Sequence, residues 1–288
     1  MFPQELIDRF IDEVAIGYRS SLHIPTDTEY DLRSCSLAAR CFRSRSQRHL
    51  LAYAPLLIAR GETQSKKVQI LREILETNEA LRQCIVHLSI NLRATEPIDD
   101  GDAEWEFHDE NLPFVINMLA EMRQLNIHCE SLYAIEWDRL SEGIKTALRN
   151  TRFTSPHLSI LGLFKMSISP YDLIGKSIKD ITLRCVKMNM GEDTSKNASI
   201  PEYRLERLRI SGREFPLHLV LQNSQTLGGL REFRVDGFRV CSDKIRQIWN
   251  VIHIASQSLR DLGLPACFGE YMFPTLEWVS AYLTDPHI

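Results

Sequence analysis

One short pattern of apolar residues recurs along most of the chain: an apolar residue, two others, an apolar residue, one other, and an apolar residue. The last two apolar positions alternate with polar ones, as one face of a short strand does, and the first fits the corner entering that strand. The interval between central residues varies from 20 positions, Leu161 to Ile181, to 37, Leu88 to Leu125. The copies are Tyr53/Leu56/Ile58, Ile85/Leu88/Ile90, Met122/Leu125/Ile127, Leu158/Leu161/Leu163, Ile178/Ile181/Leu183, Leu205/Leu208/Ile210, Leu230/Phe233/Val235 and Leu259/Leu262/Leu264.

Between the copies, apolar residues are spaced as on one face of a helix. Strands that alternate with helices predict an α/β fold of stacked βα units, and a doubly wound α/β domain is the rival arrangement. Against the rival, the strand signals are half polar, and no glycine-rich phosphate loop follows any of them. The helical stripes are Val68/Leu71/Ile74/Leu75, Leu112/Val115/Ile116/Leu119, Trp137/Leu140/Ile144/Leu148 and Ile245/Ile248/Trp249/Ile252.

The first fifty residues have the pattern of short helices instead. Pro3 fits the first turn of a helix, where its missing N–H costs little. Asp31 is expected to cap a second helix, after a loop over residues 20–30. A third short helix is expected to contain Phe42 and Leu50. The apolar face of the first helix is formed by Leu6, Ile7, Phe10, Ile11 and Val14.

These N-terminal segments resemble the F-box of fungal F-box proteins. Phe2 stands where that family usually has Leu, and Phe42 stands where it usually has Trp, so both positions remain apolar. The residues that fit the family pattern are Pro3, Glu5, Leu6, Ile7, Asp8, Ile11, Cys35, Ser36, Leu37 and Arg40. The remaining chain resembles the degenerate leucine-rich repeats that follow the F-box in this family. The resemblance implies a short helical F-box-like module over residues 1–50 and an irregular leucine-rich-repeat-like βα solenoid over residues 51–288.

The resemblance implies a non-enzymatic substrate-recognition subunit of a cullin-based, SCF-type ubiquitin ligase. The F-box end is expected to bind the ligase adaptor subunit, through Pro3, Leu6, Ile7, Ile11, Leu37 and Phe42. Strand alternation suggests that an unknown target protein binds the concave strand face, where acidic groups would meet Arg207, Arg209, Arg231 and Arg234. The alternative is a repeat-based interaction module with no ligase role, whose N-terminal helices only cap the solenoid.

Composition narrows the possible partners. The formal net charge of −4 favours neither nucleic acid nor an anionic membrane as a partner. The seven cysteines are scattered, without a CxxC pair, and no apolar run approaches the roughly 18 residues of a membrane span. We therefore expect a reduced, intracellular protein in the cytoplasm or nucleus.

Candidate chemistry is sparse. The sequence has no GxSxG, GxxxxGK[ST] or HExxH motif, so an enzyme is only the third hypothesis and no cofactor is expected. Cys84 and His87 have the spacing of a zinc-ligand pair but lack a second pair, so no metal is expected. The acidic stretch from Asp99 to Glu110 is expected to be a solvated loop.

Overall fold

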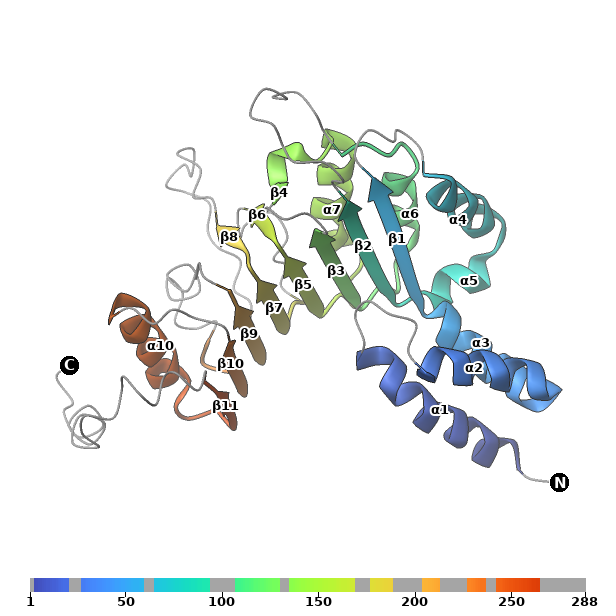
Figure 1. Cartoon of the computed structure of the whole chain (residues 1–288), viewed down its shortest axis with the longest axis horizontal. Coiled ribbons are helices and arrows are strands. Elements are labelled where there is room, and N and C mark those ends of the chain that lie inside the picture. Colours follow the sequence, from blue (N-terminus) through green and yellow to red (C-terminus); the bar gives the residue numbers. More distant parts are fainter. Residues whose placement is uncertain are drawn as a thin grey trace. The chain divides into compact units, whose positions relative to one another are not determined.

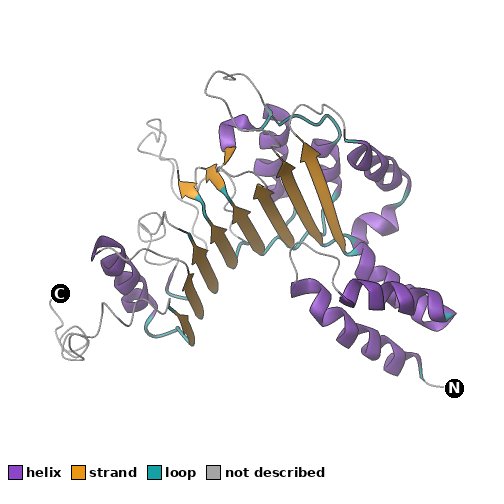
Figure 2. Cartoon of the chain, in the orientation of Figure 1, coloured by secondary structure: helices purple, strands orange, loops and turns teal. Residues whose placement is uncertain are grey.

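The computed structural model describes residues 3–20, 27–59, 65–93, 107–129, 135–168, 177–188, 204–212, 227–236 and 242–264. The chain divides into two compact units, one of residues 1–127 and 140–158 and the other of residues 128–139 and 159–288. In the first unit helices alternate with strands, as the sequence predicts (Figure 1). The described part of the second unit consists mainly of strands and loops (Figure 2).

The first unit begins with three helices and continues with βα units. Its elements are α1 (Gln4–Ser20), α2 (Asp27–Ala38), α3 (Arg40–Leu51), β1 (Tyr53–Ala59), α4 (Lys66–Thr77), α5 (Glu79–Cys84), β2 (His87–Arg93), α6 (Leu112–Met118), the start of β3 (Gln124–Cys129) and α7 (Glu142–Thr154). The second unit contains β4 (Ile135–Glu136), the 3-10 turn η1 (Trp137–Arg139), β5 (Ile160–Phe164), β6 (Met166–Ile168), β7 (Asp180–Arg184), β8 (Lys187–Met188), β9 (Arg207–Ser211), β10 (Glu232–Asp236), α10 (Ser242–Ala255) and β11 (Asp261–Gly263).

Eight strands form one parallel sheet in the order β1-β2-β3-β5-β7-β9-β10-β11. In the second unit the pairing places the central residues of the predicted triads opposite one another. One apolar row therefore contains Leu161, Ile181, Leu208, Phe233 and Leu262. The next contains Leu163, Leu183, Ile210 and Val235. All of these side chains are buried except that of Leu262, at the last described strand, so the triad pattern is confirmed there.

The register of β1 with β2 is offset by two residues from the alignment of their triads. The triads imply that Leu56 lies opposite Leu88, but Leu56 pairs with Ile90 and Ala54 pairs with Leu88. A shift of two keeps the same side chains facing inward, so alternation alone cannot distinguish the two registers. The backbone decides the register, because the Ala52 carbonyl accepts hydrogen bonds from the N–H groups of Val86 and His87.

A repeated bend follows the strands of the second unit. Lys165 and Cys185 have φ angles of 52° and 53°, and Gly212, at the corresponding position after β9, has a φ of 125°. A side chain at Gly212 would approach the Cys185 backbone to 2.9 Å, so both the conformation and the space favour glycine there. The bends at Lys165 and Cys185 lead into β6 and β8, which form a second, three-stranded parallel sheet with β4.

Helices α4, α6 and α7 pack together in the first unit (Figure 1). Asp109, which is 1% exposed, links the starts of two of them. Its carboxylate accepts the N–H of Ser65 at 2.7 Å, before α4, and those of Asn111 and Leu112 at 2.9 Å, where α6 begins. The prediction of a solvated loop is therefore wrong for Asp109, whose carboxylate satisfies N–H groups that helix starts leave unpaired. Residues 99–106 of that stretch lie outside the described residues.

Two helix predictions need correction. Helix α2 begins at Asp27, so Asp31 lies inside it rather than at its cap, and residues 27–30 are helical rather than a loop. The stripe from Trp137 to Leu148 is not one helix, because Trp137 lies in the turn η1 and Leu140 forms an isolated bridge with Phe107. Helix α7 starts only at Glu142, after the Ser141 N–H bonds to the Phe107 carbonyl. Among the described helices, none has the length and apolar character needed to cross a bilayer.

We predict that Asp109→Ala destabilises the protein by about 3 kcal/mol, because three buried N–H groups lose their acceptor. Urea unfolding followed by circular dichroism measures the change. The control is His108→Ala, at an exposed neighbouring position, which should leave the unfolding midpoint nearly unchanged. Equal effects of the two substitutions would contradict the role of the buried carboxylate.

Candidate functional site

The three N-terminal helices form a small module with its own core. Ile11 and Leu32 are completely buried, and Ala15 is 1% exposed. Four further apolar residues pack against these three and remain partly exposed: Val14, Cys35, Phe42 and Leu50. A core of this size leaves much apolar surface uncovered, because three short helices cannot enclose all of their apolar side chains.

The predicted adaptor-contact residues occupy three different environments in this module. Pro3, Leu6 and Leu37 are exposed, whereas Ile7 is half-buried. Phe42 is also half-buried and packs against the core. Ile11 is completely buried, so it stabilises the module and offers no surface to a partner.

Helix α1 has two apolar faces rather than the single face predicted from sequence. Ile11 and Ala15 face the core, whereas Leu6 and Phe10, one turn apart, are 55% and 56% exposed. The sequence groups Phe10 with Ile11 on one apolar face, and the i,i+4 spacing of Phe10 from Leu6 is the signal for a separate outward stripe. We call Pro3, Leu6, Phe10 and Leu37 the module's apolar surface.

Leu37 lies near the junction of α2 and α3, beside which helix α1 begins. It is 80% exposed at the end of α2, next to the junction with α3. The Gln4 side-chain amide donates a hydrogen bond to the Cys41 carbonyl at 3.0 Å, which places the start of α1 beside that junction. Residues 37 positions apart are thereby brought to one end of the module.

A polar cluster fastens α1 to α3. The Arg45 guanidinium donates two hydrogen bonds of 2.7 Å to the two oxygens of Asp12. The His49 ring nitrogen Nε2 lies 2.7 Å from Asp12 Oδ1, and the His49 side chain is only 7% exposed. The hydrogen bonds from Arg45 hold the pKa of the Asp12 carboxyl well below its ordinary value, with His49 adding to the shift against the opposing effect of burial.

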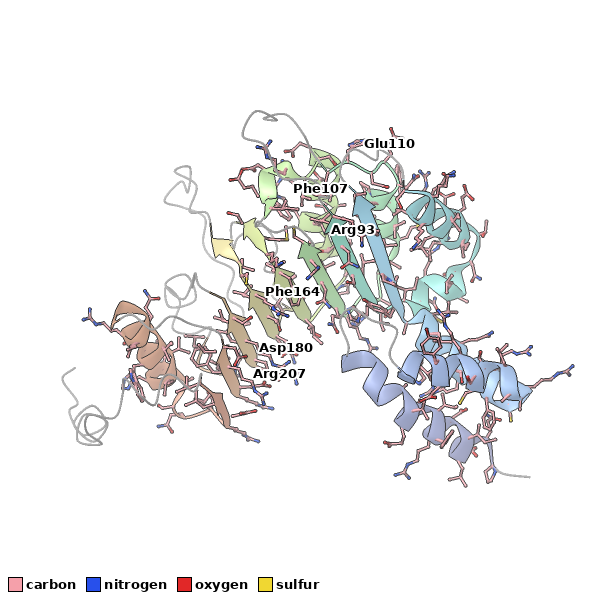
Figure 3. All side chains as sticks on the ribbon, viewed as in Figure 1. Arg93, Phe107, Glu110, Phe164, Asp180 and Arg207 are labelled. Carbon is pink, nitrogen blue, oxygen red and sulfur yellow. The ribbon has the colours of Figure 1, made fainter. Side chains whose placement is uncertain are left out.

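A second candidate surface is the charged face of β7 to β11 in the second unit. Register places Asp180, Arg207, Glu232 and Asp261 in one row and Thr182, Arg209, Arg234 and Gly263 in the next. Both rows alternate with the buried apolar rows, so they lie on the opposite face of the sheet. Figure 3 labels Asp180 and Arg207 on neighbouring strands of this face.

Most of the predicted target-binding arginines already have acidic partners on this face. Arg207 pairs with Asp180, and Arg209 donates two hydrogen bonds, of 2.8 and 3.1 Å, to the carboxylate of Glu232. Arg234 lies 3.0 Å from Glu232 and 2.7 Å from Asp261. The hydrogen bonds from Arg209 hold the pKa of Glu232 below its usual range. Three arginines and three carboxylates therefore cancel one another, and we call this set the ion-pair ladder.

Arg231, the fourth predicted arginine, differs from the other three. It lies just before β10, which begins at Glu232, so it belongs to the edge where the chain enters the strands. Its side chain is exposed, and no ion pair to it is found among the described residues. Sequence alternation grouped it with the strand arginines because it could not fix where β10 begins.

In the first unit, the polar residues His87 and Ser89 of β2 and Asn126 of β3 lie on the face of the sheet opposite the apolar row. His87 Nε2 lies 3.0 Å from the amide nitrogen of Asn126, and burial lowers the pKa of His87 to about 4, so its ring is neutral at pH 7. Ser89, beside them, is completely buried. Among the described residues, no group of three or more His, Cys, Asp or Glu side chains could hold a metal ion, and Cys84 and His87 have no further ligand there.

Comparison with protein families, with curated proteins and with solved structures found no match to this chain. The class defined by the structure is an α/β protein with N-terminal helices and an eight-stranded parallel sheet of alternating βα units.

We predict that Asp12→Asn lowers the free energy of unfolding by about 1 kcal/mol at pH 7, since it weakens charged hydrogen bonds to Arg45 and His49. The folded pKa of Asp12 lies below its ordinary value of 3.8, so the carboxylate stabilises the fold above that value and loses its contribution as the pH falls. The difference in the free energy of unfolding between wild type and variant should therefore become smaller as the pH falls. Urea unfolding at a series of pH values measures it.

The control for this prediction is Glu13→Gln, which neutralises an exposed carboxylate on the same helix. It should change stability little at any pH. A gap between wild type and Asp12→Asn that stays constant from neutral pH into strong acid would contradict the assigned role of Asp12.

Proposed function

We propose that this protein is the substrate-recognition subunit of a cullin-based ubiquitin ligase, with the N-terminal module docking the adaptor subunit. The observation that carries the proposal is the concentration of exposed apolar side chains in the N-terminal module. Of the nine large apolar side chains that are exposed among the described residues, five lie within the first 51 residues. They are Leu6, Phe10, Tyr30, Leu37 and Leu51.

Exposed apolar side chains on short helices suit a helix-in-groove contact with an apolar partner surface. Leu37 is 80% exposed and Leu6 is 55% exposed, so a partner could still bury more than half of the surface of each residue. Complete burial of a Leu side chain contributes about 1.5–3 kcal/mol. The F-box-like residues Pro3, Leu6 and Leu37 belong to this surface, which supports the adaptor as the partner.

The proposed division of labour is positional. The module holds the ligase, the sheet of the repeat region holds a target protein, and the protein catalyses no step itself. Its contribution is the raised effective concentration of the target near the ubiquitin-transfer machinery. The finer description of the repeat region as a leucine-rich-repeat-like solenoid is part of this proposal. The in-register triads of β5 to β11 support it.

A cap without a ligase role is the second candidate, and the contact between the module and the edge strand favours it. Helix α3 leads into β1 through the single residue Ala52, whose carbonyl accepts the N–H groups of Val86 and His87. The module therefore adjoins the end of the sheet at β1, which pairs only with β2 among the described strands. A cap accounts for this contact but leaves the apolar surface unexplained.

We predict that Leu6→Asp/Leu37→Asp abolishes co-purification of the chain with the cullin-ligase adaptor, because it places charges on the docking surface. Both residues are exposed, so the fold should survive, as circular dichroism and thermal unfolding would show. The matched control is Ile70→Asp/Ile74→Asp on α4, where the two side chains are 54% and 42% exposed. This control should retain adaptor binding.

Loss of binding in both double variants would attribute the effect to general surface charge rather than to the module. A folded wild-type chain that does not bind the adaptor would contradict the ligase proposal and favour the cap.

A further inference from the structure

The edge of the sheet where the chain enters β9, β10 and β11 carries cations that the ion-pair ladder does not neutralise. Backbone hydrogen bonds of 2.7 to 2.8 Å align these entry residues. The N–H of Glu206 donates to the carbonyl of Lys179, the N–H of Arg231 donates to the carbonyl of Glu206, and the N–H of Arg260 donates to the carbonyl of Arg231. Arg231 and Arg260 are both exposed. They are thus neighbours at the starts of adjacent strands, whose backbones lie about 4.8 Å apart across the sheet.

Only one carboxylate lies in this row, and it is already engaged. Glu206 pairs with Lys179 at 3.2 Å, and this contact lowers the pKa of Glu206, with Arg231 and Arg207 adding to the shift. Arg231 and Arg260 have no ion pair among the described residues. The two arginines therefore remain available to an external anion.

A third cation extends this edge. Arg204 is exposed just before β9, and its side chain lies over Gly229, in the turn that leads into β10. A side chain at Gly229 would collide with the Arg204 side chain, so the glycine leaves the space that Arg204 occupies. We call Arg204, Arg231 and Arg260 the basic edge.

We propose that the basic edge, rather than the ion-pair ladder, recognises the target, and that it binds an acidic peptide segment. The charges of the two surfaces carry this inference. An anion at Arg207, Arg209 or Arg234 must displace a carboxylate already bound there, whereas Arg231 and Arg260 have no carboxylate partner within the described part of the chain. Guanidinium groups bind carboxylates with two parallel hydrogen bonds, which suits glutamate and aspartate side chains.

This inference builds on the proposed function but occupies a different part of the chain from the adaptor surface. The test uses the isolated full chain and a fluorescein-labelled hexaglutamate peptide, followed by fluorescence anisotropy at low salt. Arg231→Glu/Arg260→Glu should weaken binding at least about tenfold, and added salt should weaken binding to wild type. A hexaglutamine peptide should not bind.

The matched control is Arg9→Glu/Arg48→Glu, which makes the same change in net charge at two exposed arginines of the N-terminal module. This control should change the dissociation constant for hexaglutamate less than twofold. Arg209→Gln, within the ion-pair ladder, should also change it less than twofold. If the charge-reversed edge variant does not fold, Arg231→Gln/Arg260→Gln takes its place.

Three outcomes would overturn the proposal: no binding of hexaglutamate to wild type, equal weakening by the two charge-reversed variants, or a larger loss in Arg209→Gln. None of them bears on adaptor co-purification, so the two proposals fail separately. Inorganic phosphate serves as a competitor. If it displaces the peptide at equal charge concentration, the edge binds anions generally and has no preference for an acidic peptide.

Discussion

The parallel register of the strands is the constraint on which the second unit depends. Leu161, Ile181, Leu208 and Phe233 lie opposite one another, and each strand adds its buried side chain to the same row. A slip of one residue on any strand would turn its apolar side chains outward and its charges inward. Burial of these rows therefore fixes every outward position as well, and the outward positions carry the charges.

Salt bridges offset the repulsion of the like charges that the register places opposite each other, which are Glu232 with Asp261 and Arg209 with Arg234. Neighbouring strands are about 4.8 Å apart, so like charges placed opposite each other would be unfavourable. Arg207 lies between Asp180 and Glu232, and the one pair of opposed arginines, Arg209 and Arg234, shares Glu232. The ladder is thus neutral by construction. Where the chain enters the strands, Arg231 and Arg260 have no ion pair among the described residues, and this is where the proposed acidic partner would bind.

The N-terminal module follows a different principle. Its core is small, and the ion pair of Asp12 with Arg45 and the contact of Asp12 with His49 supply part of its cohesion. A module that relies on polar contacts between helices leaves apolar side chains outside, and Leu6, Phe10 and Leu37 form one such set. Exposed side chains of this kind are typical of interaction surfaces rather than of a helix bundle that is complete by itself.

The sequence by itself determined the α/β class, the positions of most helices and the triads of β5 to β11, because burial imposes a period of two on strands and of 3.6 on helices. It could not determine the frame of β1, because a shift of two residues preserves that period. Nor could it separate Ile11 from Leu6, or Arg231 from Arg234, since each pair has the same residue character. Only tertiary packing decided which apolar side chain is buried and which arginine meets a carboxylate, because both depend on neighbours distant in sequence.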